Sequence, residues 1–384
     1  MQTTPQATRV ILVRHGQSTY NAQGRYQGCS DDAVLTEKGR WMAERTGQAL
    51  SQLAIDTLYT SPLQRTQETA ELILSEIAIV SNTTPDLVLH PDLPEIDLPA
   101  WEGLPFKTVR QTLSAEYQSW REYPHTFSMT PPAHSVPIGG AATLVQPRFP
   151  VQDLYTQARR FWQEILPRAE GKTILVVSHG GTIRALIGTA LHASHSLSLE
   201  PSLKTLPPEA YFHTLQQSNG GISLLTFSPC VHSPVRLETM NLTHHLGETL
   251  PKLKEGKAGL RLLLLPALDP SPPELLKILN QVPLDFFLSD RPSESAIAAF
   301  QTLLSQHDFT TKQLTTGLAF TNPAEIQSFL HPMLGLPSSA CSLVINSGSL
   351  SVVHYPTDTK HPILQALNVA TTGSHPLFFV SGDQ

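Results

Sequence analysis

Cysteine is scarce in this chain: 384 residues include three, and these lie far apart at Cys29, Cys230 and Cys341. They form no CxxC pair and their number is odd, so we expect no disulfide framework. A strong charge of one sign is also missing, because 26 lysines and arginines stand against 32 acidic residues and leave a net charge of −6. Without a chain-wide basic field we expect neither nucleic acid nor a membrane as partner, and any anion must be recognised by individually placed arginines.

Long hydrophobic runs are absent as well. The apolar stretch from Leu260 to Leu268 is interrupted by Arg261 and Pro266 and is too short to span a bilayer. The N-terminus lacks the basic, apolar and small-residue order of a secretory signal, so we expect a soluble protein of the cytoplasm. The length and a hydrophobic content of 40% suit two globular domains, predicted at residues 1–250 and 258–384.

Two short apolar runs each end in a histidine followed by glycine. Val10–Val13 leads into Arg14-His15-Gly16, and Ile174–Val177 leads into Ser178-His179-Gly180-Gly181. Such runs are typical of buried parallel strands, and helical patterns lie between them. They predict an α/β fold, a three-layer αβα sandwich around a mostly parallel sheet. The carboxyl ends of its parallel strands would share one crevice, where residues distant in sequence meet.

A third strand is predicted to end at Thr60. Ser61-Pro62-Leu63-Gln64 indicates a helix start with Ser61 as the N-cap, which puts Arg65 in the first helical turn. Between residues 104 and 150, a predicted helix over 108–122 gives way to many prolines and glycines. We interpret this insertion as a lid over the site, with a solvated loop without function as the alternative.

The groups needed for phosphoryl transfer through a protein nucleophile are present at these strand ends. The reaction needs a neutral imidazole nitrogen, positive donors for the phosphate oxygens and an acid for the departing alkoxide. His15 offers the imidazole, and His179 comes from another strand end. Arg14 and Arg65 offer permanent charge and a fork of N–H donors that suits phosphate. The sequence therefore indicates a phosphate site around His15.

Four motifs in a fixed order extend this interpretation. They are Arg14-His15-Gly16 with Asn21, Ser61 with Arg65-Thr66 and Glu68-Thr69-Ala70, Glu95 before Trp101-Glu102-Gly103, and Ser178-His179-Gly180-Gly181. Together they resemble the phosphoglycerate-mutase-like branch of the histidine phosphatase superfamily over about residues 9–246. Four motifs in one order are far more specific than any of them alone.

The resemblance implies roles for individual residues. His15 would take the phosphoryl group on one ring nitrogen while a hydrogen bond holds the other. Arg14, Arg65 and His179 would surround the phosphate oxygens. Glu95 would protonate the leaving oxygen and then activate water, and Glu102 is the reserve candidate. Five further residues are predicted to bind substrate: Asn21, Gln27, Gly28, Gly180 and, from the lid, Arg121.

The family that this chain resembles contains both hydrolases and mutases. Its mutases carry a basic pair after the acidic motif, whereas residues 119–125 here contain the single arginine Arg121, which favours water access and hydrolysis. Within the family, the paired architecture is similar to plant and cyanobacterial phosphatases of sugar derivatives. This implies a sugar phosphate or sugar-acid phosphate as substrate, such as 2-carboxyarabinitol 1-phosphate or a sugar bisphosphate. A phosphoglycerate mutase, a phosphoserine phosphatase, a metallophosphatase and a non-catalytic regulator stay open as alternatives.

Neither a cofactor nor a metal is predicted. The chain has no Walker loop and no Rossmann glycine pattern, so no nucleotide cofactor is implied. His244-His245 lacks carboxylates or cysteines at ligand spacing and is interpreted as a surface or turn pair. Cys29 is interpreted as a wall residue of the pocket, because a catalytic thiol needs an activating base.

The region after residue 258 repeats the first half weakly but in order. Leu262–Leu265 resembles Val10–Val13, with Pro266-Ala267 in the place of Arg14-His15. Three further stretches of this region are similar in sequence pattern to stretches of the first half. Residues 285–304 resemble the strand and helix around Ser61, residues 348–352 resemble 221–225, and residues 365–368 resemble 238–241. We predict a degenerate α/β copy of the fold without its nucleophile, with an unrelated appendage as the alternative.

Overall fold

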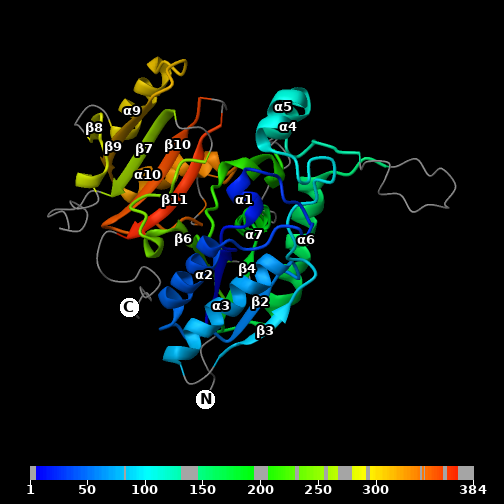
Figure 1. Cartoon of the computed structure of the whole chain (residues 1–384). Coiled ribbons are helices and arrows are strands. Elements are labelled where there is room, and N and C mark those ends of the chain that lie inside the picture. Colours follow the sequence, from blue (N-terminus) through cyan, green and yellow to red (C-terminus); the bar gives the residue numbers. More distant parts are fainter. Residues whose placement is uncertain are drawn as a thin grey trace.

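Strands from both halves of the chain join into one sheet in the computed structural model (Figure 1). The structure describes residues 6–81, 84–130, 146–193, 206–229, 233–254, 258–266, 279–290, 295–337, 340, 342–357 and 361–370. Within these residues the sheet has eleven strands in the order β3-β2-β4-β1-β5-β6-β11-β10-β7-β9-β8. The predicted α/β class is confirmed. The two halves, which were predicted as separate domains, contribute strands to the same sheet.

The N-terminal half of the sheet is parallel where the predicted site lies. β1 (Thr8–Arg14), β4 (Thr173–Ser178), β2 (Thr57–Thr60) and β3 (Asp86–Leu89) run in one direction, and β5 (Ile222–Phe227) and β6 (Arg236–Leu242) follow β1 in antiparallel pairing. β1 pairs with β4 so that Arg14 lies opposite Ser178. The next residues, His15 and His179, therefore leave the sheet side by side, as predicted.

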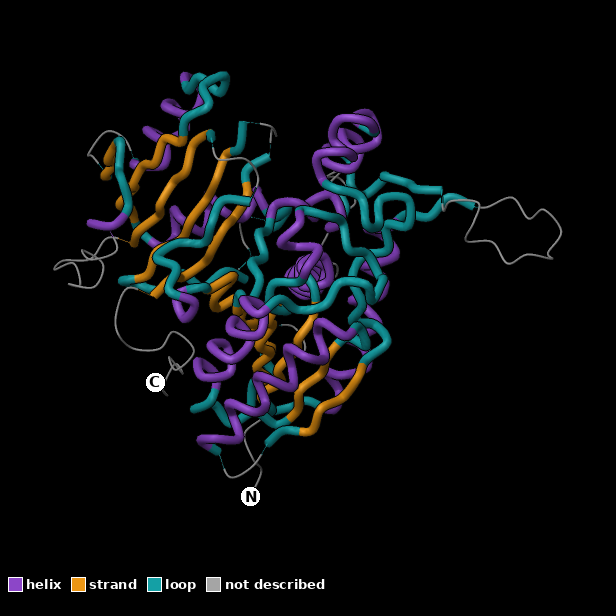
Figure 2. The backbone as a smooth tube through the Cα atoms, viewed as in Figure 1, coloured by secondary structure: helices purple, strands orange, loops and turns teal. Residues whose placement is uncertain are grey.

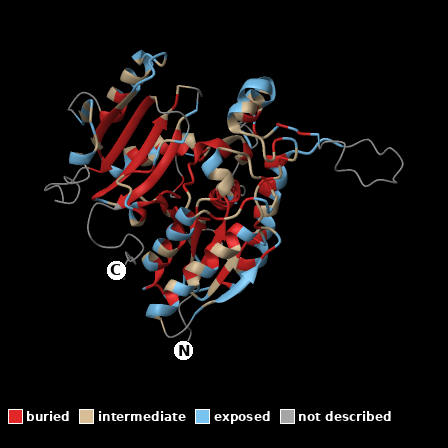
Figure 3. Ribbon diagram, viewed as in Figure 1, coloured by how far each residue is buried: buried red, intermediate tan, exposed pale blue. Residues whose placement is uncertain are grey.

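Helices cover both faces of this half and give three layers. They are α2 (Glu37–Leu50) and α3 (Gln64–Val80) on one face, and α6 (Pro150–Ile165) and α7 (Gly180–Ala193) on the other. Val10 and Leu12 of β1 pack into the α6 and α7 core, whereas Ile11 and Val13 pack into the α2 and α3 core. The two-residue period of a strand produces this alternation. Figure 3 shows the central strands buried, and the edge strand β3 and the outer sides of the helices exposed.

The lid region begins with two short helices where the sequence predicts one. α4 (Phe106–Thr112) and α5 (Ser114–Glu122) are separated at Leu113, whose backbone leaves the helical region at φ −120° and ψ 41°. Figure 2 shows both projecting from the body of the N-terminal half. The Pro- and Gly-rich part of the predicted lid at 131–145 lies outside the described residues. α1 (Thr19–Gln23) lies in the segment that follows β1.

The helix after β2 begins two residues later than predicted. α3 starts at Gln64 with Leu63 at its N-cap, so the prediction of Ser61 as the cap is wrong. Ser61 Oγ lies 2.9 Å from His179 Nε2 and accepts from Leu63 N at 3.3 Å. The Ser61 hydroxyl therefore hydrogen-bonds with the buried imidazole of His179 instead of capping α3. Arg65 lies in the first turn, as predicted.

Three 3₁₀ helices complete the described N-terminal elements. η2 (Leu166–Arg168) extends α6, η3 (Pro208–Thr214) packs on α7, and η4 (His244–Leu246) follows β6. η3 leads directly into the loop 215–219, which borders the site. In the ranges that the structure describes, no helix is both long enough and apolar enough to cross a membrane.

The C-terminal half repeats the strand order of the N-terminal half. Its elements are β7 (Gly259–Pro266), β8 (Phe286–Ser289), α9 (Ala296–Gln306), β9 (Leu314–Thr321), α10 (Pro323–Met333), β10 (Ser349–Tyr355) and β11 (Ile363–Ala370). The order β11-β10-β7-β9-β8 matches β6-β5-β1-β4-β2, and each pair has the same parallel or antiparallel sense. α9 shares the core of α6, α7 and α10, so its place corresponds to α6. The predicted match of α9 to the helix after Thr60 is therefore wrong, because that helix, α3, packs on the other face of the sheet.

β6 and β11 join the halves as an antiparallel pair. Asn241 and Asn368 hold this joint, and both have a left-handed backbone, with φ of 55° and 56°, which asparagine tolerates better than most residues. Asn241 Nδ2 donates to Gln365 O at 2.7 Å, and Asn368 Nδ2 donates to Glu238 O at 2.6 Å. Each asparagine thus donates to the carbonyl three residues before the other asparagine, once from the first half to the second and once in reverse. This exchange shows that the halves are related by an approximate two-fold rotation.

Candidate active site

His15 directly follows β1 and is 1% exposed. Its Nδ1 lies 2.7 Å from Gly16 O. Because a carbonyl only accepts hydrogen bonds, Nδ1 carries the proton of the neutral ring and Nε2 holds the lone pair. Nε2 is buried and has no hydrogen-bond partner among the described residues. The loop therefore fixes the tautomer in which the lone pair of Nε2 is free.

His179 stands beside His15 at the end of β4. The ring centroids lie 5.2 Å apart with the planes at 63°, and Ser61 holds His179 through Nε2. Burial holds the pKa of both histidines well below its usual range, and the Arg65 and Arg14 guanidinium groups lower it further. Both rings are therefore neutral at pH 7, and the lone pair on His15 Nε2 is available.

Two arginines reach these rings from different elements. Arg65, in the first turn of α3, is fully buried and donates from Nη1 to Ser30 O at 2.8 Å and from Nη2 to Gly28 O at 3.0 Å. Arg14 ends β1 and donates from Nη1 to Gln217 O at 2.8 Å. Burial lowers the pKa of Arg14 to about 10, which leaves it charged at neutral pH. Backbone carbonyls thus fix the orientation of both guanidinium groups.

Four buried nitrogens of these side chains lack a hydrogen-bond partner within the described ranges. They are Arg14 Nε, His15 Nε2, Arg65 Nε and His179 Nδ1. A buried polar atom without a partner costs on the order of 1–3 kcal/mol, so four together indicate a place for ligand oxygens rather than a packing fault. We call Arg14, His15, Arg65 and His179 the histidine–arginine cluster. Its charge and its N–H groups fit a phosphoryl group.

Glu95 lies next to the cluster, in the segment after β3. Its Oε1 accepts from Gly181 N at 3.0 Å and from Ile96 N at 2.9 Å. Gly181 stands in the first turn of α7, where the helix dipole favours a negative group. Glycine leaves room for Glu95 in this position, because a Cβ would lie 2.3 Å from Glu95 Oε1. The charge of Glu95 also favours the charged forms of Arg14 and Arg65.

Glu102 and Cys29 line the same region with different properties. Burial raises the pKa of Glu102, and hydrogen bonds with Ser30 oppose that rise. Cys29 donates from Sγ to Glu95 O at 3.0 Å, and burial together with nearby carboxylates raises the pKa of the thiol to about 12. A protonated thiol is a poor nucleophile, which agrees with the interpretation of Cys29 as a wall residue.

The predicted phosphate-binding residues of the loop after β1 make hydrogen bonds within the protein. Asn21 Oδ1 accepts from Asn219 Nδ2 at 2.8 Å, and Gln27 Oε1 accepts from Ser18 Oγ at 2.8 Å. Gly28, also predicted to bind substrate, accepts from Arg65 through its carbonyl oxygen. These contacts shape the wall of the site, and direct binding of substrate by the three residues stays a prediction.

Gly180 lies close to the Arg14 side chain of the cluster. A Cβ at this position would lie 3.2 Å from Arg14 Nε and 3.3 Å from Arg14 Cζ. The lack of a side chain lets the start of α7 pack closely against the guanidinium group, and direct binding of substrate by Gly180 stays a prediction.

Sequence reasoning missed Asn219. Its Nδ2 donates to His15 O at 3.0 Å, to Gly16 O at 3.2 Å and to Asn21 Oδ1. Asn219 precedes β5, and β5 pairs with β1, so the residues before β5 lie beside the residues after β1. The antiparallel pairing is the signal that would have found it, and the sequence does not reveal that pairing.

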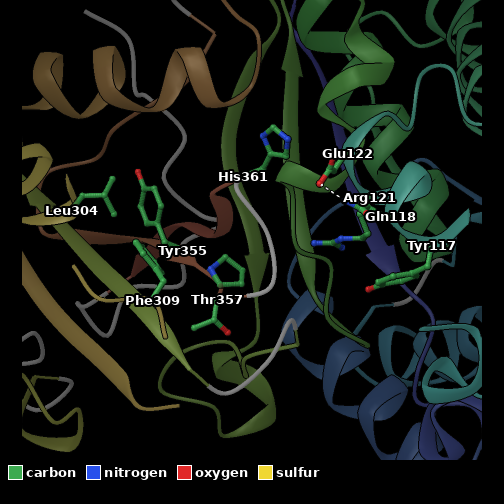
Figure 4. A pocket seen from close by; sticks show the side chains of 10 residues that line it. Tyr117, Gln118, Arg121, Glu122, Leu304, Phe309, Tyr355, Thr357 and His361 are labelled. Atoms are coloured by element: carbon green, nitrogen blue, oxygen red, sulfur yellow. Dashed lines mark hydrogen bonds between the residues drawn. The ribbon is translucent and has the colours of Figure 1, made fainter. Parts of the chain in front are cut away.

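Arg121 lines a cavity of about 660 Å³ that is separate from the cluster. Figure 4 shows Arg121 and Tyr117 of α5 facing Tyr355 and His361 of the C-terminal half across this space. None of the four cluster residues lines the cavity. The structure thus brings together the predicted catalytic residues and places the predicted lid arginine elsewhere, so its contact with substrate stays a prediction.

No three histidine, cysteine or acidic side chains gather into a metal site in the part of the chain that the structure describes. The neighbouring His244 and His245 rings have centroids 5.9 Å apart. His245 Nε2 lies 3.1 Å from Thr46 Oγ1, which ties the segment after β6 to α2. This contact indicates a structural role for His245.

Comparison with known proteins agrees with this arrangement. The family model "Histidine phosphatase superfamily (branch 1)" matches residues 10–237. That range is more than half of the chain, and it contains Glu95 and the whole histidine–arginine cluster.

Three curated relatives are similar to the N-terminal half. A probable 2-carboxy-D-arabinitol-1-phosphatase of Arabidopsis thaliana is 36% identical over 221 residues, 58% of this chain and 38% of the relative. The 2-carboxy-D-arabinitol-1-phosphatase of Triticum aestivum is 38% identical over 224 residues, with the same shares of each chain. Phosphoserine phosphatase 1 of Hydrogenobacter thermophilus is 32% identical over 178 residues, 46% of this chain and 74% of the relative. The match thus spans about two fifths of the length of the two plant proteins.

Proposed function

The chain belongs to branch 1 of the histidine phosphatase superfamily. We propose that it is a phosphatase and that it hydrolyses a small phosphomonoester through a phosphohistidine at His15. The proposed substrate is a sugar phosphate or a sugar-acid phosphate, such as 2-carboxyarabinitol 1-phosphate or a sugar bisphosphate. The names of the two plant relatives, at 36% and 38% identity, support this class.

One observation carries the proposal: four nitrogens of the histidine–arginine cluster are buried without a partner among the described residues. Arg14 and Arg65 supply permanent charge to the phosphate oxygens, and backbone carbonyls hold both in place before substrate arrives. Such preorganised donors stabilise the charge of a transferring phosphoryl group without reorganisation during the reaction. His15 Nε2 is the nucleophile in the same place.

The proposed reaction has two balanced steps. His15 Nε2 attacks phosphorus, the phosphorus–oxygen ester bond breaks, and Glu95 gives a proton to the departing alkoxide. The phosphorus–nitrogen bond then breaks as water attacks, and the Glu95 carboxylate takes the proton of that water. Inorganic phosphate leaves and His15 returns to its neutral form. The backbone bonds from Gly181 and Ile96 support this dual role, because they fix the carboxylate beside the cluster.

We further propose that the C-terminal half is a degenerate copy of the phosphatase domain, so that each chain has one active site. The repeated strand order supports this. By register and sequence order, the positions of Arg14, Ser61 and His179 correspond to Pro266, Asp290 and Asn322. There, Thr321 Oγ1 lies 3.1 Å from Asp290 Oδ2 and 2.7 Å from Glu325 Oε2. Two carboxylates repel a phosphate where the first half offers arginines.

The location of the reaction is proposed as the cytoplasm. Cys29 is a free thiol, and a chain with three widely spaced cysteines suits a reducing compartment. No metal takes part in the proposed steps, because the histidine–arginine cluster supplies both the nucleophile and the positive charge.

Phosphate release with a chelator present tests the proposal. The panel contains sugar bisphosphates, sugar-acid phosphates, phosphoserine and phosphoglycerates. We expect the wild-type chain to release phosphate from at least one of them, and His15→Ala to lower that rate by about 10⁴-fold or more. His245→Ala, which removes a histidine outside the cluster, is the control and should stay within about threefold.

Other outcomes would select the alternatives. Loss of activity in the chelator would favour a metallophosphatase, and an active His15→Ala chain would refute the assigned nucleophile. Faster formation of isomer than of free phosphate from 3-phosphoglycerate, with a bisphosphoglycerate primer, would identify a mutase. No turnover of any compound would favour the non-catalytic regulator.

A further inference from the structure

Lys254 reaches the histidine–arginine cluster from the segment that precedes β7. Its Nζ donates to Gln217 O, the same carbonyl oxygen that accepts from Arg14 Nη1 at 2.8 Å. The match to the family model ends at residue 237, so Lys254 lies outside it. The chain beyond the family match thus brings an additional cation to the edge of the phosphate site.

The backbone around Lys254 is held in place from both halves. Arg261 Nη2 of β7 donates to Pro251 O at 2.6 Å, and Gln216 Nε2 donates to Lys252 O at 2.9 Å. Gln216 is itself bonded through its Oε1 to a side chain of β11 at 3.0 Å. Lys254 therefore projects from an anchored segment, and its position beside Gln217 follows from the docking of the C-terminal half.

Two cations lie close together at this point, beside a buried amide. Arg14 and Lys254 share one neutral acceptor, so two like charges lie close together, and with Arg65 they lower the pKa of His15. The side-chain amide of Gln217 is buried, and neither its nitrogen nor its oxygen has a partner among the described residues. A second anion beside the phosphoryl group would relieve the repulsion between the two cations.

We propose that Lys254 binds a second anionic group of the substrate, a carboxylate or another phosphate, next to the phosphoryl group held by Arg14. The proposal rests on the proposed function and narrows it to phosphomonoesters with two anionic groups. Lys254 is exposed, so this group can approach from solvent, whereas Arg65 is fully buried. An ammonium suits either anion, because it acts as a compact charge with rotatable donors.

Binding of two probes to the His15→Ala chain tests this proposal, because that chain holds ligand without turning it over. The probes are inorganic phosphate and 3-phosphoglycerate, which adds a carboxylate, and each is titrated by calorimetry. We expect Lys254→Met to weaken binding of 3-phosphoglycerate by about tenfold or more and binding of phosphate by about threefold or less. Lys254→Arg should restore 3-phosphoglycerate binding to within about threefold.

Lys252→Met is the matched control, because Lys252 Nζ pairs with Glu248 at 2.8 Å and is 69% exposed. It should change neither affinity. Equal weakening of both probes by Lys254→Met would show general charge or structural support and would overturn the proposal, as would no change for either probe. Failure of the proposed function is seen separately, as absence of phosphate release by the wild-type chain, and the titration still reports on Lys254 in that case.

Discussion

Replacing Gly181 by alanine moves Glu95 without removing it. The new methyl carbon would lie 2.3 Å from Glu95 Oε1 and 3.4 Å from Ile96 Cγ2. Carbon and oxygen atoms in contact stay about 3.3 Å apart, so the carboxylate must shift by roughly 1 Å. A displacement of this size costs about 100-fold in rate when the group takes part in the chemistry. Alanine is favoured over glycine inside a helix by about 1 kcal/mol, which offsets the weakened bond from Gly181 N.

The assay compares two classes of substrate that differ in their need for an acid. An alkyl phosphate has a poor leaving group and depends on Glu95, whereas an aryl phosphate leaves with little help. We expect Gly181→Ala to lower kcat/KM about 100-fold for the alkyl ester and less than fivefold for the aryl ester, with Tm changed by a few degrees at most. Glu95→Gln should show the same selectivity. Equal losses for both esters, or unchanged turnover of the alkyl ester, would refute Glu95 as the acid.

Two predictions concern stability. Asn241→Ala should lower the free energy of unfolding by about 3 kcal/mol, because it removes buried bonds across the joint and strains a left-handed backbone, whereas Asn241→Gly should lose about 1 kcal/mol less. Urea unfolding measures both, and a wild-type midpoint for Asn241→Ala would contradict the role of the joint. Burial holds the pKa of His15, His179 and His213 well below 6.5, so below pH 6.5 the unfolded chain binds more protons than the folded one. The free energy of unfolding should therefore fall with pH below 6.5, by up to about 1.4 kcal/mol per unit for each histidine, and a urea midpoint that is unchanged or higher at pH 5.5 than at pH 7.5 would refute this.

Features fixed by local pattern were predictable from the sequence. An apolar run that stops at Arg14 determines both the end of β1 and the position of His15, and the same pattern places His179. Arg65 lies in the first turn of α3 as predicted, although this helix begins two residues later than the sequence indicates. Parallel strands bring their carboxyl ends to one edge, so these residues meet without any further information.

Features fixed by tertiary contact were not predictable in this way. Ser61 has the chemistry of an N-cap, but a buried histidine from another strand uses its hydroxyl. Asn219 and Lys254 enter the site because β5 pairs with β1 and because the C-terminal half docks beside it. The division of the lid helix at Leu113 has no proline or glycine to mark it. The pairing of β6 with β11 joins strands more than a hundred residues apart, and no local pattern of hydrophobic residues indicates that pairing.

The joint between β6 and β11 makes the association of the two halves independent of protein concentration. Each strand would be an unpaired edge in an isolated half, and such edges attract other chains. Because both strands belong to one chain, each meets its partner at a high effective concentration that dilution does not change. Equivalent strands that meet about a two-fold axis are also the way in which two identical subunits pair. The molecule is thus arranged as a dimer fused into one polypeptide, and the half without the histidine–arginine cluster stays covalently attached to the half that contains it.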